Sequence, residues 1–328
     1  MAPIRGFFVW SGGALLILIP FFLFAILGWP AHPDSCTNIN AAGQQVAKYE
    51  DGVLQPPDSC YCEHFEVQDV VDGKPGIRQK INTYSNFYAL FTSLGLVFWI
   101  RCDRKKVLEE GAEQKNNFWN SDTWIPELYV FAALFLGLGS MFLHASLSST
   151  LSWFDGMSMY VFTSFLPVYT LQRRFNLGIF FYTGYAVSVI VFTMLNRLPG
   201  MEDASTILIA ILLALYAGAE LTVTIYDIVK MGFIEWGKRL YRSLFKDGWL
   251  LAPIGFWFAG LASFGLAAYF RAKSQTGHPM CHPMSWFQPH GLLWHTLAGV
   301  MAVLLYFYWR GLRDNDGIGP GPMESSDS

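Results

Sequence analysis

The amino-acid sequence predicts an all-α integral membrane protein: a bundle of seven spanning helices with one further hydrophobic helix at the N-terminus. Of the 328 residues, 53% are hydrophobic and only 14% are charged, a balance that soluble domains of this size rarely have. The chain also contains eight mostly apolar runs of about 20 residues, the length that crosses roughly 30 Å of hydrocarbon. A net charge of −3 and the lack of a basic domain argue against a nucleic-acid partner.

The apolar runs divide the chain into four regions. The runs lie at about 6–29, 81–101, 123–145, 150–171, 176–195, 204–226, 249–270 and 289–311. The first, in region 1–30, follows Arg5 and is either a retained helix or a secretory signal peptide; its length favours a retained helix. We expect an extracytoplasmic segment at 31–80, a seven-helix core at 81–311, and a polar, disordered tail at 312–328.

Lysine and arginine in the connecting loops predict the orientation, because cytoplasmic loops carry the excess of these residues. Most of them lie after the second, fourth and sixth runs and at the C-terminus. The segment between the first two runs is mixed and leans acidic, and few lie between the remaining runs. The second run therefore starts outside, and the C-terminal tail lies in the cytoplasm.

This topology sorts the five cysteines. Cys36, Cys60, Cys62 and Cys281 lie outside, whereas Cys102 lies at the cytoplasmic end of the second run. Disulfides persist only in oxidising compartments, so two disulfides are possible among the outer four, in three pairings. A bond to Cys281 would tie the segment before the core to the loop before the last run. Metal binding by the Cys60-Tyr61-Cys62 stretch is the alternative, although the second cysteine pair of the usual zinc motifs is missing.

Polar residues gather near the predicted extracytoplasmic ends of three runs. Ser140 and His144 lie in "GSMFLHASLSS", Asp155 lies in "SWFDGMSMY", and His290 and His295 open the last run. At 1.5 Å per residue, each lies within roughly 10 Å of that boundary. Ionisable residues inside a membrane are costly and usually face partners within the bundle. We therefore expect these residues to form one site.

The residue types at this depth suit a catalytic zinc centre, which takes three protein ligands and leaves a fourth position open. We expect His144, His290 and His295 to bind Zn²⁺. Asp155 is the candidate general base. Ser140, one helical turn before His144, could hydrogen-bond the metal water or a developing oxyanion. Taken singly, each histidine could be an interfacial anchor, Ser140 a packing residue and Asp155 a favourable charge at a helix start.

The spacing of the last two histidines is unusual. Residues five apart on a regular helix point about 140° away from each other, so both imidazoles cannot face one metal. A π-bulge would realign them, or His290 could precede the helix and reach back after Pro289. Alternatively, His282 or His278 of the preceding loop replaces His290 as the ligand.

These motifs together resemble the alkaline ceramidase family, within the wider group of seven-helix membrane hydrolases that includes the adiponectin receptors. The shared pattern is S-x-x-x-H at Ser140 and His144, Asp155 eleven residues later, and a histidine cluster ending in W-H. "CYCE" at 60–63 and "INTYSNF" at 81–87 are similar to the family's acidic motif and the start of its first core helix. "WHTLAG" at 294–299 is similar to its last-helix signature. The first hydrophobic run is an extension.

The resemblance implies a zinc-holding bundle that hydrolyses the amide bond of a ceramide, a membrane lipid, to a sphingoid base and a fatty acid. Ser140 and Asp155 would take the catalytic roles, on the extracytoplasmic or lumenal side. Some relatives build a Ca²⁺ site from acidic residues, but here only Glu63 matches, which weakens the case for calcium. The alternative function is a lipid or ligand sensor of the adiponectin-receptor type with little turnover. A structural or transport role is the third hypothesis, and the lack of a lysine in the last run argues against a retinal protein.

Overall fold

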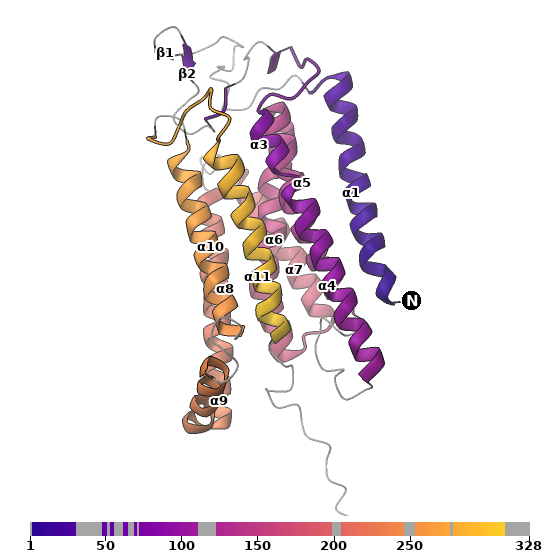
Figure 1. Ribbon diagram of the computed structural model, residues 1–328, viewed down its shortest axis with the longest axis vertical. Coiled ribbons are helices and arrows are strands. Elements are labelled where there is room, and N and C mark those ends of the chain that lie inside the picture. Colours follow the sequence, from indigo (N-terminus) through magenta and orange to yellow (C-terminus); the bar gives the residue numbers. More distant parts are fainter. Residues whose placement is uncertain are drawn as a thin grey trace, which may run out of the picture.

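The computed structural model describes ten stretches of the chain. They are residues 2–30, 48–50, 53–55, 62–64, 69–70, 72–110, 123–198, 205–245, 253–275 and 278–311. Within these stretches the protein is an elongated bundle whose long helices run along one axis (Figure 1).

Each predicted apolar run coincides with helical structure. The helices are α1 (Ala2–Leu27), α3 (Lys80–Ser85), α4 (Tyr88–Glu110), α5 (Ile125–Ser146), α6 (Ser149–Phe175), α7 (Ile179–Leu195), α8 (Ser205–Met231), α9 (Phe233–Phe245), α10 (Pro253–Lys273) and α11 (His295–Gly311). A π-helical turn, η3 (His290–Trp294), leads directly into α11. Strands β1 (Lys48–Glu50) and β2 (Val53–Gln55) form an antiparallel ribbon.

Three features differ from the sequence prediction. The second run is split into α3 and α4, because the chain forms a turn at Asn86 and Phe87. The loop expected after the sixth run contains α9, which follows α8 after one residue, Gly232. The ribbon of β1 and β2 was not predicted either.

Within the described residues, five helical segments are long and apolar enough to cross a membrane. They are Arg5–Leu27, Ile125–Ser146, Ser205–Lys230, Ile254–Lys273 and His290–Gly311. Of the remaining long helices, α7 is apolar but shorter, and α4 and α6 carry more polar and charged side chains. These spans are those expected of a membrane protein.

Aromatic side chains fill the centre of the bundle between α5, α6 and α11. The Trp309 ring is buried, and its centroid lies 4.8 Å from that of Tyr169 and 5.5 Å from that of Tyr129. Gly139 allows α5 to approach α6 closely, since a Cβ at this position would lie only 2.6 Å from Ser158 Cβ. The backbones of α5 and α6, which carry the predicted site residues Ser140, His144 and Asp155, are therefore held against each other.

The N-terminal helix α1 packs beside α4 and α5 (Figure 1). The Trp10 indole donates a hydrogen bond to Ser93 of α4. Just beyond α1, the Trp29 indole donates to the carbonyl of Gly76, and the Gly76 amide donates to the Ala25 carbonyl. The end of α1 therefore holds the loop that enters α3.

A disulfide joins Cys62 to Cys281, in the loop before η3. Next to it, the His64 amide donates to the Pro283 carbonyl. The predicted link between the segment before the core and the last loop is thus confirmed, and Cys62 is not available for the alternative metal motif. Cys36 and Cys60 lie outside the described residues. Cys102 is the free cysteine among the described residues.

Candidate metal centre

Three buried histidines meet at one end of the bundle, the end that holds α3 and the start of α11 in Figure 1. We call this the histidine end. His144 comes from the last turn of α5, His290 begins η3, and His295 begins α11. One ligand atom from each ring lies within 4.8 Å of the other two, and the Nε2 atoms of His144 and His290 are 3.3 Å apart. This group can hold a metal ion.

The π-helical turn resolves the five-residue spacing. In a π-helix the backbone hydrogen bonds run from residue i to i+5, so a residue five positions on follows after one turn. Both imidazoles consequently reach the same place, which was the first of the three predicted alternatives. His282, the predicted substitute for His290, lies exposed on the preceding loop and outside the cluster.

A glycine allows η3 to approach α3. A Cβ at Gly291 would lie 2.7 Å from Asn82 Oδ1 and 3.0 Å from Ser85 Oγ, closer than side chains normally tolerate. Only a residue without a Cβ allows α3 to reach the histidines. The structure shows why this contact is important: α3 and the residue preceding it supply the hydrogen bonds that orient the rings.

Gln79, immediately before α3, fixes the ring of His144. Its Oε1 lies 2.8 Å from His144 Nδ1, and its Nε2 donates to the Glu63 carbonyl. An amide oxygen can only accept, so His144 must carry its proton on Nδ1. The lone pair on Nε2 is then directed at the cluster, as in the histidine ligands of protein metal sites.

Ser85 of α3 plays the same role for His295. Its hydroxyl donates to the Asn82 carbonyl at 2.9 Å, so the oxygen accepts from His295 Nδ1 at 2.8 Å. The Nε2 atom of His295 is then left with a lone pair, and it has no hydrogen-bond partner within the described residues although it is buried. Buried polar atoms are normally satisfied, and a metal ion at this position would satisfy this one. The donor set therefore fits a metal.

Glu63 contributes to the support of α3. Its two carboxylate oxygens accept from the backbone amides of Ile81 and Asn82, at 2.7 and 2.8 Å. Burial raises the pKa of Glu63 above its usual value, although these hydrogen bonds oppose the shift. Glu63, the weak candidate for a calcium ligand, thus caps the start of α3, and no group of three or more acidic ligands surrounds it among the described residues.

Both predicted catalytic residues lie at the histidine end. Ser140 is buried on α5, one turn before His144. Asp155 is buried in the second turn of α6, which begins after a two-residue connection from the end of α5. The Tyr88 ring of α4 stacks on His295, with 6.1 Å between centroids.

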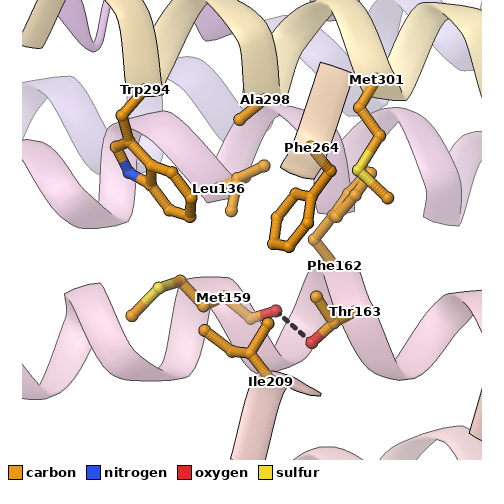
Figure 2. Close-up of a pocket in the computed structure, with 9 residues that line it drawn as sticks. All are labelled: Leu136, Met159, Phe162, Thr163, Ile209, Phe264, Trp294, Ala298 and Met301. Atoms are coloured by element: carbon orange, nitrogen blue, oxygen red, sulfur yellow. Dashed lines mark hydrogen bonds between the residues drawn. The ribbon is translucent and has the colours of Figure 1, made fainter. Parts of the chain in front are cut away.

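An apolar pocket adjoins the cluster; we call it the Trp294 pocket (Figure 2). Its lining includes Leu136, Phe162, Ile209, Phe264, Trp294 and Met301. The hydroxyl of Thr163 donates to the Met159 carbonyl at 2.7 Å, the dashed line in Figure 2. The Trp294 ring stacks on His290, with 6.4 Å between centroids. A single indole therefore separates the pocket from a candidate metal ligand.

No protein-family model matches the chain, and no curated protein or solved structure matches it either. Function is consequently argued from the site itself. Two residues that matter here, Gln79 and Ser85, were not singled out from the sequence. Ser85 lies in the "INTYSNF" motif at 81–87, which was used only for the resemblance. For Gln79 the available signal was an uncharged polar side chain just before an otherwise apolar run.

Proposed function

We propose that the protein is a zinc-dependent intramembrane amide hydrolase that cleaves ceramide-type lipids to a sphingoid base and a fatty acid. The observation that carries the proposal is the group of three buried histidines, two of which have their outer nitrogen held by Gln79 and Ser85. Three neutral imidazoles suit zinc among the common metals, and three protein ligands leave the fourth position that catalysis needs.

The neighbouring polar residues fit the requirements of amide hydrolysis. A bound zinc ion would activate water and polarise the amide carbonyl. Asp155 accepts the proton of the attacking water and returns it to the leaving amine. The hydroxyl of Ser140 donates a hydrogen bond to the oxygen on which negative charge develops.

The Trp294 pocket supports a lipid as the substrate. Its lining is apolar, it lies between helices of the bundle, and the Trp294 ring of its lining stacks on His290. An acyl chain that widened this pocket would lie beside the Trp294 ring and place the amide at its head near the histidines. The resemblance of the sequence motifs to alkaline ceramidases adds the class of amide lipid.

The proposal includes the topology predicted from the sequence. Seven spans would be formed by α3 with α4, then α5, α6, α7, α8, α10 and η3 with α11, and α1 would add an eighth. The disulfide between Cys62 and Cys281 supports a histidine end on the extracytoplasmic or lumenal side, since disulfides persist in oxidising compartments. The C-terminus would then be cytoplasmic.

Turnover by the purified protein tests this function. We expect fatty acid to be released from ceramide within a panel of N-acyl lipids. Asp155→Asn should reduce the rate by about 10²–10⁴-fold, the usual contribution of a general base, with zinc retained. The matched control is Asp103→Asn, a buried aspartate on α4 far from the histidines, which should keep the rate.

Two results would count against hydrolysis. Full activity in Asp155→Asn would remove the assigned base. Zinc bound in stoichiometric amount without release of product from any lipid of the panel would favour the sensor, which shares the metal site but not the turnover.

A further inference from the structure

The helix α9 has two chemically different faces. Its sequence, "FIEWGKRLYRSLF", repeats apolar residues at helical spacing and places lysine and arginine between them. At 100° per residue, Phe233, Ile234, Trp236 and Tyr241 share one arc of about 160°, whereas Glu235 and Lys238 lie outside it. This pattern is typical of helices that lie along a membrane surface.

The connection to α8 keeps α9 at the membrane. Ser205–Lys230 is one of the spanning candidates, and α8 ends at Met231. Gly232, with φ of +83°, ends α8 by donating its amide to Ile228, and its carbonyl accepts from Trp236 in the first turn of α9. One residue spans about 3.8 Å, so α9 begins where the span ends, at the end of the bundle opposite the histidines (Figure 1).

Of the four apolar side chains described on this face of α9, three are exposed. Phe233 is 72% exposed, Ile234 75% and Tyr241 60%. Trp236 is half-buried, with its ring 6.2 Å from that of Phe233. In water this face would be an aggregation hazard, whereas at the end of a spanning helix the acyl-chain boundary of the bilayer is available to cover it.

The charge around α9 is positive. From 230 to 246 the sequence has five basic residues, Lys230, Lys238, Arg239, Arg242 and Lys246, against one acidic residue, Glu235. The Lys238 ammonium is exposed and lies 3.5 Å from Glu235. At the same end, the Arg174 guanidinium stacks on Tyr226 of α8 at 4.3 Å. This charge is complementary to anionic lipid head groups.

We propose that α9 is an interfacial helix whose apolar face enters the bilayer and whose basic residues bind the head groups of anionic phospholipids. The inference does not depend on the metal centre or on hydrolysis. It assigns the protein a second lipid-binding surface, at the opposite end from the histidines, that selects lipids by head-group charge.

The position of α9 is tested by depth measurements on the full-length protein in vesicles of phosphatidylcholine and phosphatidylserine. Phe233→Cys and Glu235→Cys are each made in a background with Cys36→Ser, Cys60→Ser and Cys102→Ser and labelled with bimane. Lipids brominated on the acyl chain should quench the label at 233 and spare the label at 235. Equal quenching at both sites would overturn the proposal. A bimane signal at position 233 that changes with the number of protein chains per vesicle, and not with the brominated lipid, would also overturn the proposal. In that case a second copy of the protein would cover the apolar face.

Lipid selectivity is tested by native mass spectrometry of the purified protein titrated with phosphatidylserine or phosphatidylcholine. We expect a preference for phosphatidylserine that falls about fivefold for each basic residue removed. Lys238→Gln with Arg239→Gln should therefore lose most of the preference. The control with the same change in charge, Lys74→Gln with Lys80→Gln, lies at the histidine end and should keep it. Equal preference in both variants would overturn the role of α9.

Discussion

The two ends of the bundle treat buried polar groups differently. Opposite the histidine end, the Glu220 carboxylate accepts from Thr170, Arg173 and Tyr308 at 2.8, 3.1 and 2.9 Å. At the histidine end, His295 Nε2 is buried without a hydrogen-bond partner in the described part of the chain.

Two further carboxylates at the opposite end are paired as well. Asp103 accepts from the Tyr306 hydroxyl at 2.6 Å and from the Arg310 guanidinium at 2.7 Å. The Glu127 carboxylate accepts hydrogen bonds from both terminal nitrogens of the Arg104 guanidinium. Charges inside a membrane are tolerated when they are paired in this way, so we interpret these networks as structural.

The difference lies in the groups that converge. At the opposite end each of these carboxylates meets a cation, whereas at the histidine end three imidazoles converge and could hold a metal ion. At the histidine end, Gln79 and Ser85 each hydrogen-bond the Nδ1 atom of a histidine, on the side of the ring away from the cluster. The Nε2 lone pairs of His144 and His295 are thereby left facing the cluster. If the two ends are separate, a substitution at one end should leave the other unchanged.

The largest effect on stability should come from Glu220→Ala. Removing one partner of a buried ion pair typically costs about 3–5 kcal/mol, because Arg173 would be left buried without its carboxylate. The measurement is the unfolding transition of the purified protein, with zinc content determined on the folded fraction. The control is Glu235→Ala. Glu235 is exposed and lies outside the apolar face of α9, so this substitution should change stability by less than about 0.5 kcal/mol. Loss of zinc from folded Glu220→Ala would show that the two ends are coupled.

A smaller effect, on zinc affinity alone, is expected from Gln79→Ala. Loss of the hydrogen bond to a ligand histidine usually lowers metal affinity by about 10–100-fold, because His144 loses its fixed tautomer and ring orientation. Competition with a chelator measures the affinity. Gln172→Ala, which removes another buried glutamine, at the far end of α6, is the control and should leave zinc binding unchanged. Gln79→Glu keeps an oxygen acceptor and should retain zinc; equal loss in all three variants would contradict the assigned role.

The smallest effect should follow deletion of Leu292 within η3. The deletion changes the spacing to H-x-x-x-H, and residues four apart on a regular α-helix lie about 40° apart. Zinc affinity should remain within about tenfold of the wild type, since one α-helical turn replaces one π-helical turn. Deletion of Val300, in the regular part of α11, rotates the histidines relative to the rest of that helix and should abolish binding. Loss of zinc in both deletions would mean that the π-helical turn is needed for more than spacing.

Sequence reasoning succeeded where the information is local. The length of each apolar run can be counted directly in the sequence. The depths of His144 and His295 in the membrane follow from the number of residues between each histidine and the end of its run. Gln79 and Ser85 were missed because their partners lie 65 and 210 residues away, and a hydrogen bond across that separation has no local signature. The π-helical turn was predictable only in part. The five-residue spacing of His290 and His295 showed that a regular α-helix could not place both rings at one metal, but it did not show which of the three alternatives the chain adopts.

The prediction of a loop where α9 lies shows a different kind of error. Lys238 and the arginines after it were used to assign the side of the membrane, and their helical spacing between apolar residues was not considered. The division between α3 and α4 was missed for the opposite reason: Asn86 and Phe87 interrupt the helix without interrupting the apolar run.

The metal content of the purified protein tests the central claim most directly. We expect about one zinc ion per chain in the wild type, as for a centre with three histidine ligands. His295→Ala should fold and lose the metal, whereas His282→Ala should retain it. A wild-type protein without zinc, or a folded His295→Ala variant with zinc still bound, would contradict the account.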